Sequence, residues 1–311
     1  MRHCKYFLLI FFIAFLILPL LFAWRKEPVI PANINMFSLP ETISVFQVET
    51  GTIALLPLDD CVSQMLAGET ILVSSQEGLK ALAIAARSYL LHQIFCTPKE
   101  NPSHPDAMLC DRPNHCFSFS ASIPDEVEQA VKETSGEYLI YDNLPAKACY
   151  FNISAGQTES SLDIWGVDLP YLVSVDSQYD QEAVGYHSRV FYPLEAFQLA
   201  FKGTKKVADT NVSPIVSDIS RTENGSVKSL LVFGITFTGE EIQNLFRLKS
   251  RNFSIEIQDK TVIFDVKGDG HGVGMSKYGA KQKAENGSTY REILEYYYPS
   301  TTLIRKNTGD I

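Results

Sequence analysis

Glu77–Leu91, EGLKALAIAARSYLL, is the stretch that decides the fold of this 311-residue chain. Four of its apolar residues recur at helical spacing and would share one face: Leu79, Ala83, Ala86 and Leu90. We therefore expect a helix over Ser75–Phe95. Its four alanines would let another element approach closely.

The segments on either side of this helix alternate in type. We expect strands at Ser44–Glu49 and Gly51–Leu58, a helix at Pro124–Thr134, a hairpin from Ser254–Ile257 and Thr261–Val266, and helices at Met275–Glu285 and Tyr290–Tyr298. Helices and strands are mixed without a steady βαβ rhythm, which favours an α+β fold over a doubly wound parallel sheet.

The N-terminal segment Tyr6–Trp24 is typical of a membrane span, because 18 of its 19 residues are apolar and none is charged. A cleaved secretory signal is the alternative, although no small-x-small cleavage site precedes Arg25. We expect an uncleaved signal anchor. The expected order is a cytoplasmic stub (1–5), the anchor (6–24), a tether (25–43), one folded domain (44–305) and a short tail (306–311).

Charge divides unevenly along the chain. The first 26 residues hold four basic and no acidic residues. Residues 27–311 hold 23 basic and 36 acidic residues, so their net charge is −13. Binding to nucleic acid through phosphates needs clustered Lys and Arg, so an acidic body argues against that class of function.

Cysteines and histidines gather between the two central helices. His104, Cys110 and Cys116 recur every six residues, and thiolates with an imidazole favour zinc over calcium or magnesium. A disulfide between Cys110 and Cys116 is an equally good interpretation outside the cytoplasm. Apart from Cys4 in the stub, the chain has five cysteines, an odd number, so at least one is free, metal-bound or paired with another chain.

Two glutamates flank the start of the central helix. Glu77 follows Ser74 by three residues, so the two fit a capping box with a structural role. Glu69 has no such partner; partial burial would keep it protonated, as a general acid requires, and an exposed loop residue is the alternative.

Two further motifs fit a ligand site. Gly270–Ala280, GHGVGMSKYGA, surrounds His271 with glycines that let backbone approach a ligand, or forms a tight turn before a helix. Tyr150–Ser161, YFNISAGQTESS, followed by Trp165, offers hydroxyls, amides and an aromatic ring that would line a carbohydrate groove, or is a polar surface loop.

Taken together, six motifs resemble the stage II sporulation protein D family in order and approximate spacing over residues 40–305. They are PLDDCVSQMLAGE (57–69), EGLKALAIAARSYLL (77–91), SAGQTESS (154–161), PYLVSVDSQYD (170–180), GHGVGMSKYGA (270–280) and YREILEYYYP (290–299). The chain departs from the family pattern at several positions, among them Gly78, where Ala is commoner, and Lys277, where Gln is usual.

The resemblance implies an α+β, two-lobed domain outside the cytoplasm, with a substrate groove, behind a single transmembrane helix. It implies a lytic transglycosylase that cleaves between N-acetylmuramic acid and N-acetylglucosamine in peptide-stripped peptidoglycan during forespore engulfment. The family's essential glutamate falls on Glu69, and its zinc ligands fall on His104, Cys110 and Cys116. We expect that zinc to be structural.

Residues expected to position the sugars are Ser154, Thr158, His271, Ser276 and Tyr278. The resemblance further implies stage II sporulation proteins P and M as partners, at the membrane with which the mother cell engulfs the forespore. Two other functions stay open: a muramidase-type hydrolase with Glu77 as a second acid, and a non-catalytic glycan-binding scaffold that activates a cell-wall amidase.

Overall fold

The structure, a computed structural model, describes residues 38–69, 73–96, 106–112, 116–202, 204, 207, 209–210 and 212–306. The predicted membrane span Tyr6–Trp24 lies outside these residues. Within them, none of the helices has both the length and the apolar character that a bilayer crossing requires.

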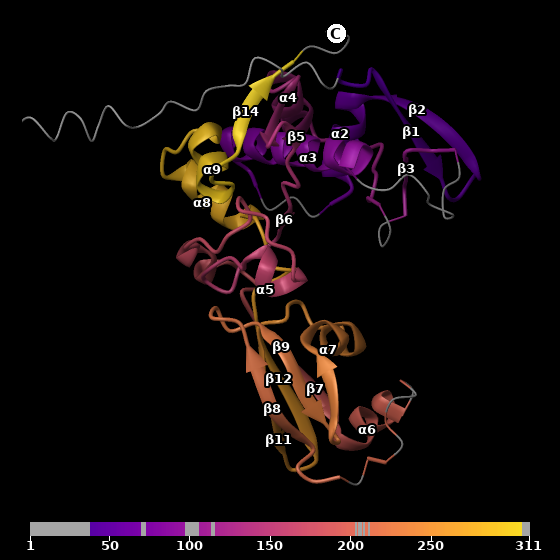
Figure 1. The fold of residues 1–311 in the computed structure, drawn as a ribbon, viewed down its shortest axis with the longest axis vertical. Coiled ribbons are helices and arrows are strands. Elements are labelled where there is room, and N and C mark those ends of the chain that lie inside the picture. Colours follow the sequence, from indigo (N-terminus) through magenta and orange to yellow (C-terminus); the bar gives the residue numbers. More distant parts are fainter. Residues whose placement is uncertain are drawn as a thin grey trace, which may run out of the picture. The chain divides into compact units, whose positions relative to one another are not determined.

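Helices and strands follow one another in mixed order (Figure 1). The strands are β1 (Thr42–Gln47), β2 (Thr52–Pro57), β3 (Leu109–Cys110), β4 (Glu137–Tyr141), β5 (Leu144–Pro145), β6 (Tyr150–Phe151), β7 (His187–Pro193), β8 (Val216–Arg221), β9 (Val227–Val232), β10 (Ile235–Thr238), β11 (Phe253–Gln258), β12 (Thr261–Lys267), β13 (Met275–Ser276) and β14 (Thr302–Arg305). The helices are α2 (Leu58–Ala67), α3 (Gln76–Cys96), α4 (Asp125–Glu133), α5 (Ser161–Trp165), the 3₁₀ helix η2 (Gln178–Glu182), α6 (Leu194–Lys202), α7 (Gly239–Phe246), α8 (Lys277–Glu285) and α9 (Tyr290–Tyr297).

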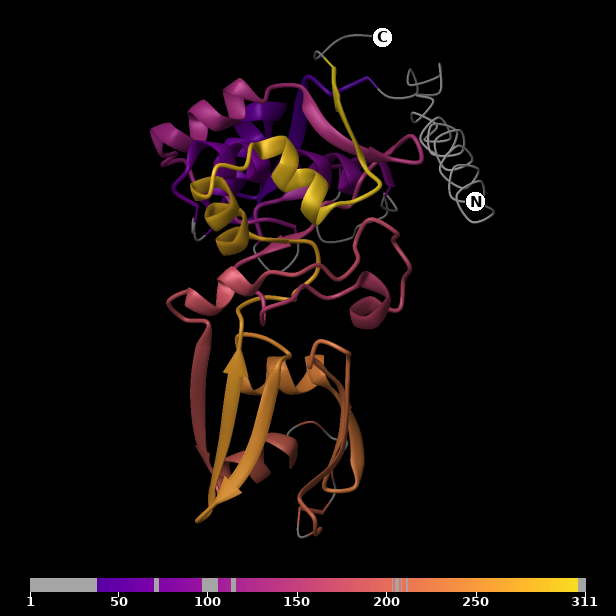
Figure 2. The same ribbon diagram turned by 90° about the vertical axis from the view of Figure 1, so that its left-hand side faces the viewer.

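Helix α3 is the centre of the first hydrophobic cluster. It contacts α2, α4, α8 and α9 as well as β4 (Figures 1 and 2). Its alanines at 81, 83, 85 and 86 are all fully buried, as expected for a helix approached closely by its neighbours. The prediction of this helix is confirmed to within one residue at each end.

A second cluster contains two three-stranded antiparallel sheets, β11-β12-β7 and β10-β9-β8, and helices α6 and α7. Aromatic rings fill it; Phe197 stacks on Phe246 with ring centroids 5.0 Å apart. The predicted hairpin is the β11–β12 pair, in which Gln258 lies opposite Thr261. The α+β class is therefore confirmed, with several small sheets in place of one large one.

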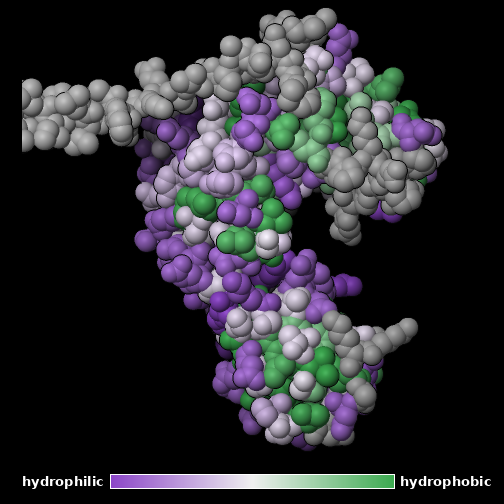
Figure 3. Space-filling model, viewed as in Figure 1, coloured by the Kyte–Doolittle hydropathy of each residue, from purple (hydrophilic) through white to green (hydrophobic). Residues whose placement is uncertain are grey.

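The surface seen in Figure 3 carries hydrophobic residues in separate patches among hydrophilic ones. Single exposed apolar side chains such as Leu55 and Leu199 are ordinary on soluble domains.

Glu77 has a structural role, but not the predicted one. Its Oε2 accepts a hydrogen bond from the backbone N–H of Tyr290 at 2.8 Å, and its Oε1 accepts one from Lys80 at 3.0 Å. The capping box with Ser74 is wrong, because the carboxylate instead satisfies an unpaired amide in the first turn of α9. Gly78 follows Glu77, and a Cβ there would lie 2.5 Å from Val73 Cγ1 and 2.8 Å from Ser75 Oγ, so these side chains would have to move to admit the more usual Ala.

Candidate active site

A cavity of about 380 Å³ has the size of a small-molecule site. It is lined by Glu69, Tyr89, Cys116, Phe117, Lys147, Cys149, Tyr150, Trp165 and His271. Four of these side chains are aromatic rings of Tyr, Phe or Trp, which offer flat apolar faces to a ligand. Glu69 is the one carboxylate among the described residues that line the cavity.

Both carboxylate oxygens of Glu69 accept hydrogen bonds. The Tyr150 hydroxyl donates to Oε1 at 3.0 Å, and the Lys277 ammonium donates to Oε2 at 2.6 Å. The Lys277 side chain is 5% exposed, whereas Glu69 is 29% exposed. The carboxylate is thus held from the protein side while part of it stays accessible, which is the arrangement expected of a group that exchanges protons with a ligand.

A short parallel strand pair brings Tyr150 and Lys277 together. In the β6–β13 pair Tyr150 lies opposite Met275, and Lys277 follows β13 directly as the first residue of α8. The predicted helix Met275–Glu285 therefore begins two residues later than expected. Gly274 permits this pairing, because its φ is +84° and a Cβ there would overlap the carbonyl oxygen of Cys149.

A buried carboxylate, Asp180, ties three loops together behind this pair. Its Oδ2 accepts hydrogen bonds from the Ser154 N–H (2.8 Å) and the Ser177 hydroxyl (3.1 Å), and its Oδ1 accepts one from the Ser276 hydroxyl (2.9 Å). Burial raises the pKa of Asp180, and these hydrogen bonds oppose that rise. Sequence analysis assigned Asp180 no role, although it ends the motif PYLVSVDSQYD.

Of the five residues expected to position sugars, His271 alone is among the described residues that line the large cavity. Ser154, Thr158 and Ser276 are buried, and their hydroxyls bond within the protein; Thr158 Oγ1, for example, accepts from the N–H of Val175 at 2.9 Å. Tyr278 is half-buried on α8. Trp165, the aromatic residue singled out after the polar motif, does line the cavity.

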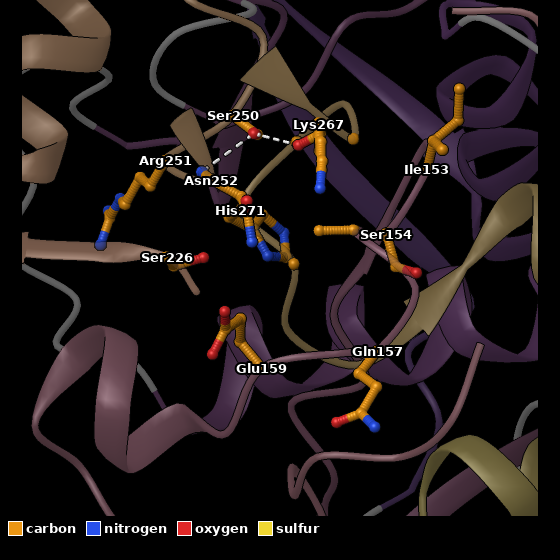
Figure 4. A pocket seen from close by; sticks show the side chains of 14 residues that line it. Ile153, Ser154, Gln157, Glu159, Ser226, Ser250, Arg251, Asn252, Lys267 and His271 are labelled. Atoms are coloured by element: carbon orange, nitrogen blue, oxygen red, sulfur yellow. Dashed lines mark hydrogen bonds between the residues drawn. The ribbon is translucent and has the colours of Figure 1, made fainter. Parts of the chain in front are cut away.

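His271 also lines a second pocket, with Glu159, Ser226 and Arg251 (Figure 4). Its volume is about 10 Å³, the space of one water molecule. This pocket is too small for a sugar ring, so the larger cavity is the candidate site.

His271 is neutral in the folded protein. Burial lowers its pKa from 6.5 to about 4; the positive charges of Arg251 and Lys147 act in the same direction, and a backbone hydrogen bond with Tyr150 opposes them. Its Nδ1 accepts a hydrogen bond from the Val273 N–H at 3.1 Å. His271 therefore lines the cavity as an uncharged ring.

This shift predicts acid-sensitive stability. Between pH 6.5 and 4 the unfolded chain binds a proton at His271 that the folded protein does not, so the free energy of unfolding falls as pH falls. We expect His271→Gln to remove on the order of 2 kcal/mol of this loss. Urea unfolding at pH 7 and pH 4.5 measures the free energy of unfolding of both proteins. An equal decrease in the variant and the wild type between these pH values would contradict the prediction.

Two of the three predicted zinc ligands lie together. The thiols of Cys110, on β3, and Cys116 are within hydrogen-bonding contact, and burial raises the pKa of Cys116 to about 11. His104 lies outside the described residues, and no group of three or more His, Cys, Asp or Glu suited to a metal occurs within them. None of the five cysteines from Cys61 onward is in a disulfide within the described residues, so the alternative of a Cys110–Cys116 disulfide is not what the structure shows.

Sequence analysis missed several cavity residues. Tyr150 opens the polar motif, but nothing in the sequence predicts its hydrogen bond to Glu69. Lys277 departs from the family pattern, but its ion pair with Glu69 is not predictable from that. Lys147 precedes that motif in a segment with no recognisable signal. The one signal in the sequence was Lys277, which stands in the motif GHGVGMSKYGA where Gln is usual.

Comparison with known proteins agrees with the resemblance inferred from the motifs. Residues 47–141 match the family model described as SpoIID, stage II sporulation protein. The chain is 28% identical to stage II sporulation protein D of Bacillus subtilis and 27% identical to that of Bacillus amyloliquefaciens, in each case over 85% of this chain and 79% of the relative. It is also 24% identical to an amidase enhancer of Bacillus subtilis, over 74% of this chain and 38% of that protein.

These matches support a role in sporulation and confirm the resemblance. Residues 47–141 carry the SpoIID family domain, and the chain is similar over 85% of its length to stage II sporulation protein D.

Proposed function

We propose that this protein is a peptidoglycan lytic transglycosylase that acts on peptide-stripped glycan strands during forespore engulfment. The observation that carries the proposal is Glu69, an accessible carboxylate and the one acid among the described residues that line an aromatic-rich cavity of about 380 Å³. A hydrolase ordinarily needs a second carboxylate, whereas a transglycosylase that closes an anhydro ring needs one.

Glu69 acts first as an acid and then as a base. In its protonated form it gives a proton to the oxygen between N-acetylmuramic acid and N-acetylglucosamine, and the bond from that oxygen to C1 of the muramic acid breaks. The C6 hydroxyl of the same muramic acid attacks C1 and gives its proton to the Glu69 carboxylate. The products are a 1,6-anhydro end and a free GlcNAc hydroxyl, and Glu69 is protonated again.

Tyr150 and Lys277 serve this cycle by holding the carboxylate. Lys277 supplies a buried positive charge 2.6 Å from Oε2, which stabilises Glu69 in the ionised form between the two proton transfers. Tyr150 donates to Oε1, and burial together with the charge of Glu69 raises the pKa of its hydroxyl, so that it stays a neutral donor.

Two alternative functions predict other products. A muramidase-type hydrolase would need a second acid, and Glu77 is engaged with Tyr290 and is not one of the described cavity residues. A glycan-binding scaffold that stimulates an amidase is favoured by the similarity to an amidase enhancer.

Mass spectrometry of peptide-stripped glycan after digestion separates these functions. Fragments that end in 1,6-anhydro-N-acetylmuramic acid are expected from the transglycosylase, reducing ends from a muramidase, and no cleavage from a scaffold. Either of the last two results would overturn the proposal.

A structural zinc ion is part of the proposal. Cys110 and Cys116 would hold it as thiolates with the imidazole of His104, and the contact between the two thiols fits this ligand set. Zinc would hold in place the loop that contains Cys116 and Phe117, two residues that line the cavity.

Elemental analysis tests the zinc site. We expect about one zinc per wild-type chain and its loss in Cys110→Ser, because a hydroxyl is a poor zinc ligand. The matched variant Cys61→Ala alters a thiol buried in α2 and should keep the metal. Unchanged zinc in Cys110→Ser would contradict this ligand set.

The proposed setting is the membrane with which the mother cell engulfs the forespore. The segment Tyr6–Trp24 would anchor the domain outside the cytoplasm, and stage II sporulation proteins P and M are the proposed partners. Protease protection of the domain in intact cells, and co-purification with either partner, are the direct tests.

A further inference from the structure

The charges around the large cavity do not balance. The Glu69 carboxylate is matched by the Lys277 ammonium at 2.6 Å. A second cation, Lys147, lines the cavity, and among the described residues no carboxylate lies within ion-pair distance of it. Even when Glu69 is ionised, at least one positive charge of the cavity has no counter-charge among the described residues, in a chain whose net charge is −9.

The remaining titratable groups near Lys147 do not supply the missing anion. His271 is neutral, because its pKa is lowered to about 4. Burial raises the pKa of Cys149 to about 12, so its thiol is protonated, and the Tyr150 hydroxyl is protonated for the same reason. Among the described residues no anionic group pairs with Lys147, so its ammonium is available to an anionic group of a ligand.

Lys147 lies in the wall of the cavity in which the proposed function places the sugar. Its backbone N–H donates to the Tyr171 hydroxyl at 2.9 Å, between β5 and β6. Its ammonium lies 4.8 Å from the centre of the Trp165 ring, which lines the same cavity. The ammonium lies over the Trp165 ring, so a sugar that enters the cavity and contacts the edge of this ring would bring its substituents next to Lys147.

We propose that Lys147 forms a subsite for a carboxylate carried by the sugar, namely the lactyl carboxylate of muramic acid. This proposal rests on the proposed function. In peptide-bearing glycan the lactyl carboxyl is an amide and carries no charge, whereas in stripped glycan it is an anion. Lys147 thereby makes this chain prefer stripped strands.

The test compares two forms of one substrate. Stripped glycan strands are used with free lactyl carboxylates, and after conversion of these to methylamides. We expect methylamidation to weaken binding by the wild-type chain about tenfold, measured by calorimetry. Lys147→Met should bind the free strands as weakly as the wild type binds the amidated ones, with no further loss on amidation.

Two controls isolate the charge from general damage. Lys283→Met removes another lysine that lies over an aromatic ring, Tyr296, but is not one of the described cavity residues, and it should behave as the wild type. Oligomers of N-acetylglucosamine carry no lactyl group, so Lys147→Met should bind them as the wild type does.

The outcomes separate this proposal from the proposed function. If Lys147→Met keeps the preference for free carboxylates, the subsite is wrong even where anhydro products form. If the wild type shows the Lys147-dependent preference but yields no anhydro products, the subsite stands and the transglycosylase is wrong. If the wild type binds neither form, both proposals are overturned.

Discussion

Glu69→Gln is expected to slow the release of fragments that end in 1,6-anhydro-N-acetylmuramic acid by on the order of 10²–10⁴-fold. Gln has nearly the shape of Glu but can neither give nor take the proton that both steps of the proposed reaction require. The described cavity residues include no second carboxylate that could take over. Mass spectrometry of stripped glycan, with product followed over time, measures the effect.

The ion pair with Lys277 calls for a second variant. Glu69→Gln leaves a lysine that is 5% exposed without its counter-charge, which can destabilise the fold and mimic a catalytic loss. Glu69→Gln combined with Lys277→Met removes both charges, so we expect it to recover thermal stability but not activity. Lys281→Met, one turn further along α8 with a surface pair to Glu285, should change neither.

The assignment is open to a direct contradiction. If Glu77→Gln abolishes the product and Glu69→Gln does not, the acid has been placed on the wrong residue. If the double variant regains activity, the lost activity of Glu69→Gln reflects the unpaired lysine and not proton transfer.

Helices were predictable here because their signals are local. The apolar spacing of Glu77–Leu91 places α3 to within one residue of its observed ends. Helix α9 begins at Tyr290 as predicted, where Thr289 and Glu292 form a capping box, and it ends two residues before Pro299. In both helices the deciding residues lie within a few positions of one another.

The chemistry of the cavity was less predictable because its parts lie far apart in the chain. Tyr150 is 81 residues from Glu69, and Lys277 is 208 residues from it. They meet through β6 and β13, strands of two residues each, which are too short to show any periodicity. Motif resemblance could point to Glu69, but not to the side chains that hold it.

Arg87 shows the same limit within the most predictable helix. It is fully buried in α3, where an alanine-rich run gives no hint of a partner. Its Nε and Nη2 donate to Asp59 Oδ1 at 3.0 and 2.7 Å, and its guanidinium also donates to the carbonyl oxygens of Val131, Thr134 and Glu137. One side chain thus joins α3 to the first turn of α2 and to the end of α4.

Removing this guanidinium should strongly destabilise the fold. Burial lowers the pKa of Arg87 and the Asp59 carboxylate opposes that effect, so the charge is maintained by its partner. Arg87→Met would leave Asp59 without its cation and would remove the hydrogen bonds that the guanidinium donates to three carbonyl oxygens. Breaking a buried pair in this way costs about 3–5 kcal/mol of unfolding free energy.

Thermal unfolding of Arg87→Met measures this cost. We expect the midpoint to fall by roughly 6–20 °C, since 1 kcal/mol shifts a domain of this size by about 2–4 °C. Arg189→Met is the matched control, because that arginine is 51% exposed and lies 3.5 Å from Asp265. Ion pairs at the surface contribute little to the free energy of unfolding. Arg87→Lys keeps the charge but not the planar fork of donors, so it should fall between the two. Equal midpoints for Arg87→Met and Arg189→Met would show that the network around Arg87 does not stabilise the junction of α2, α3 and α4.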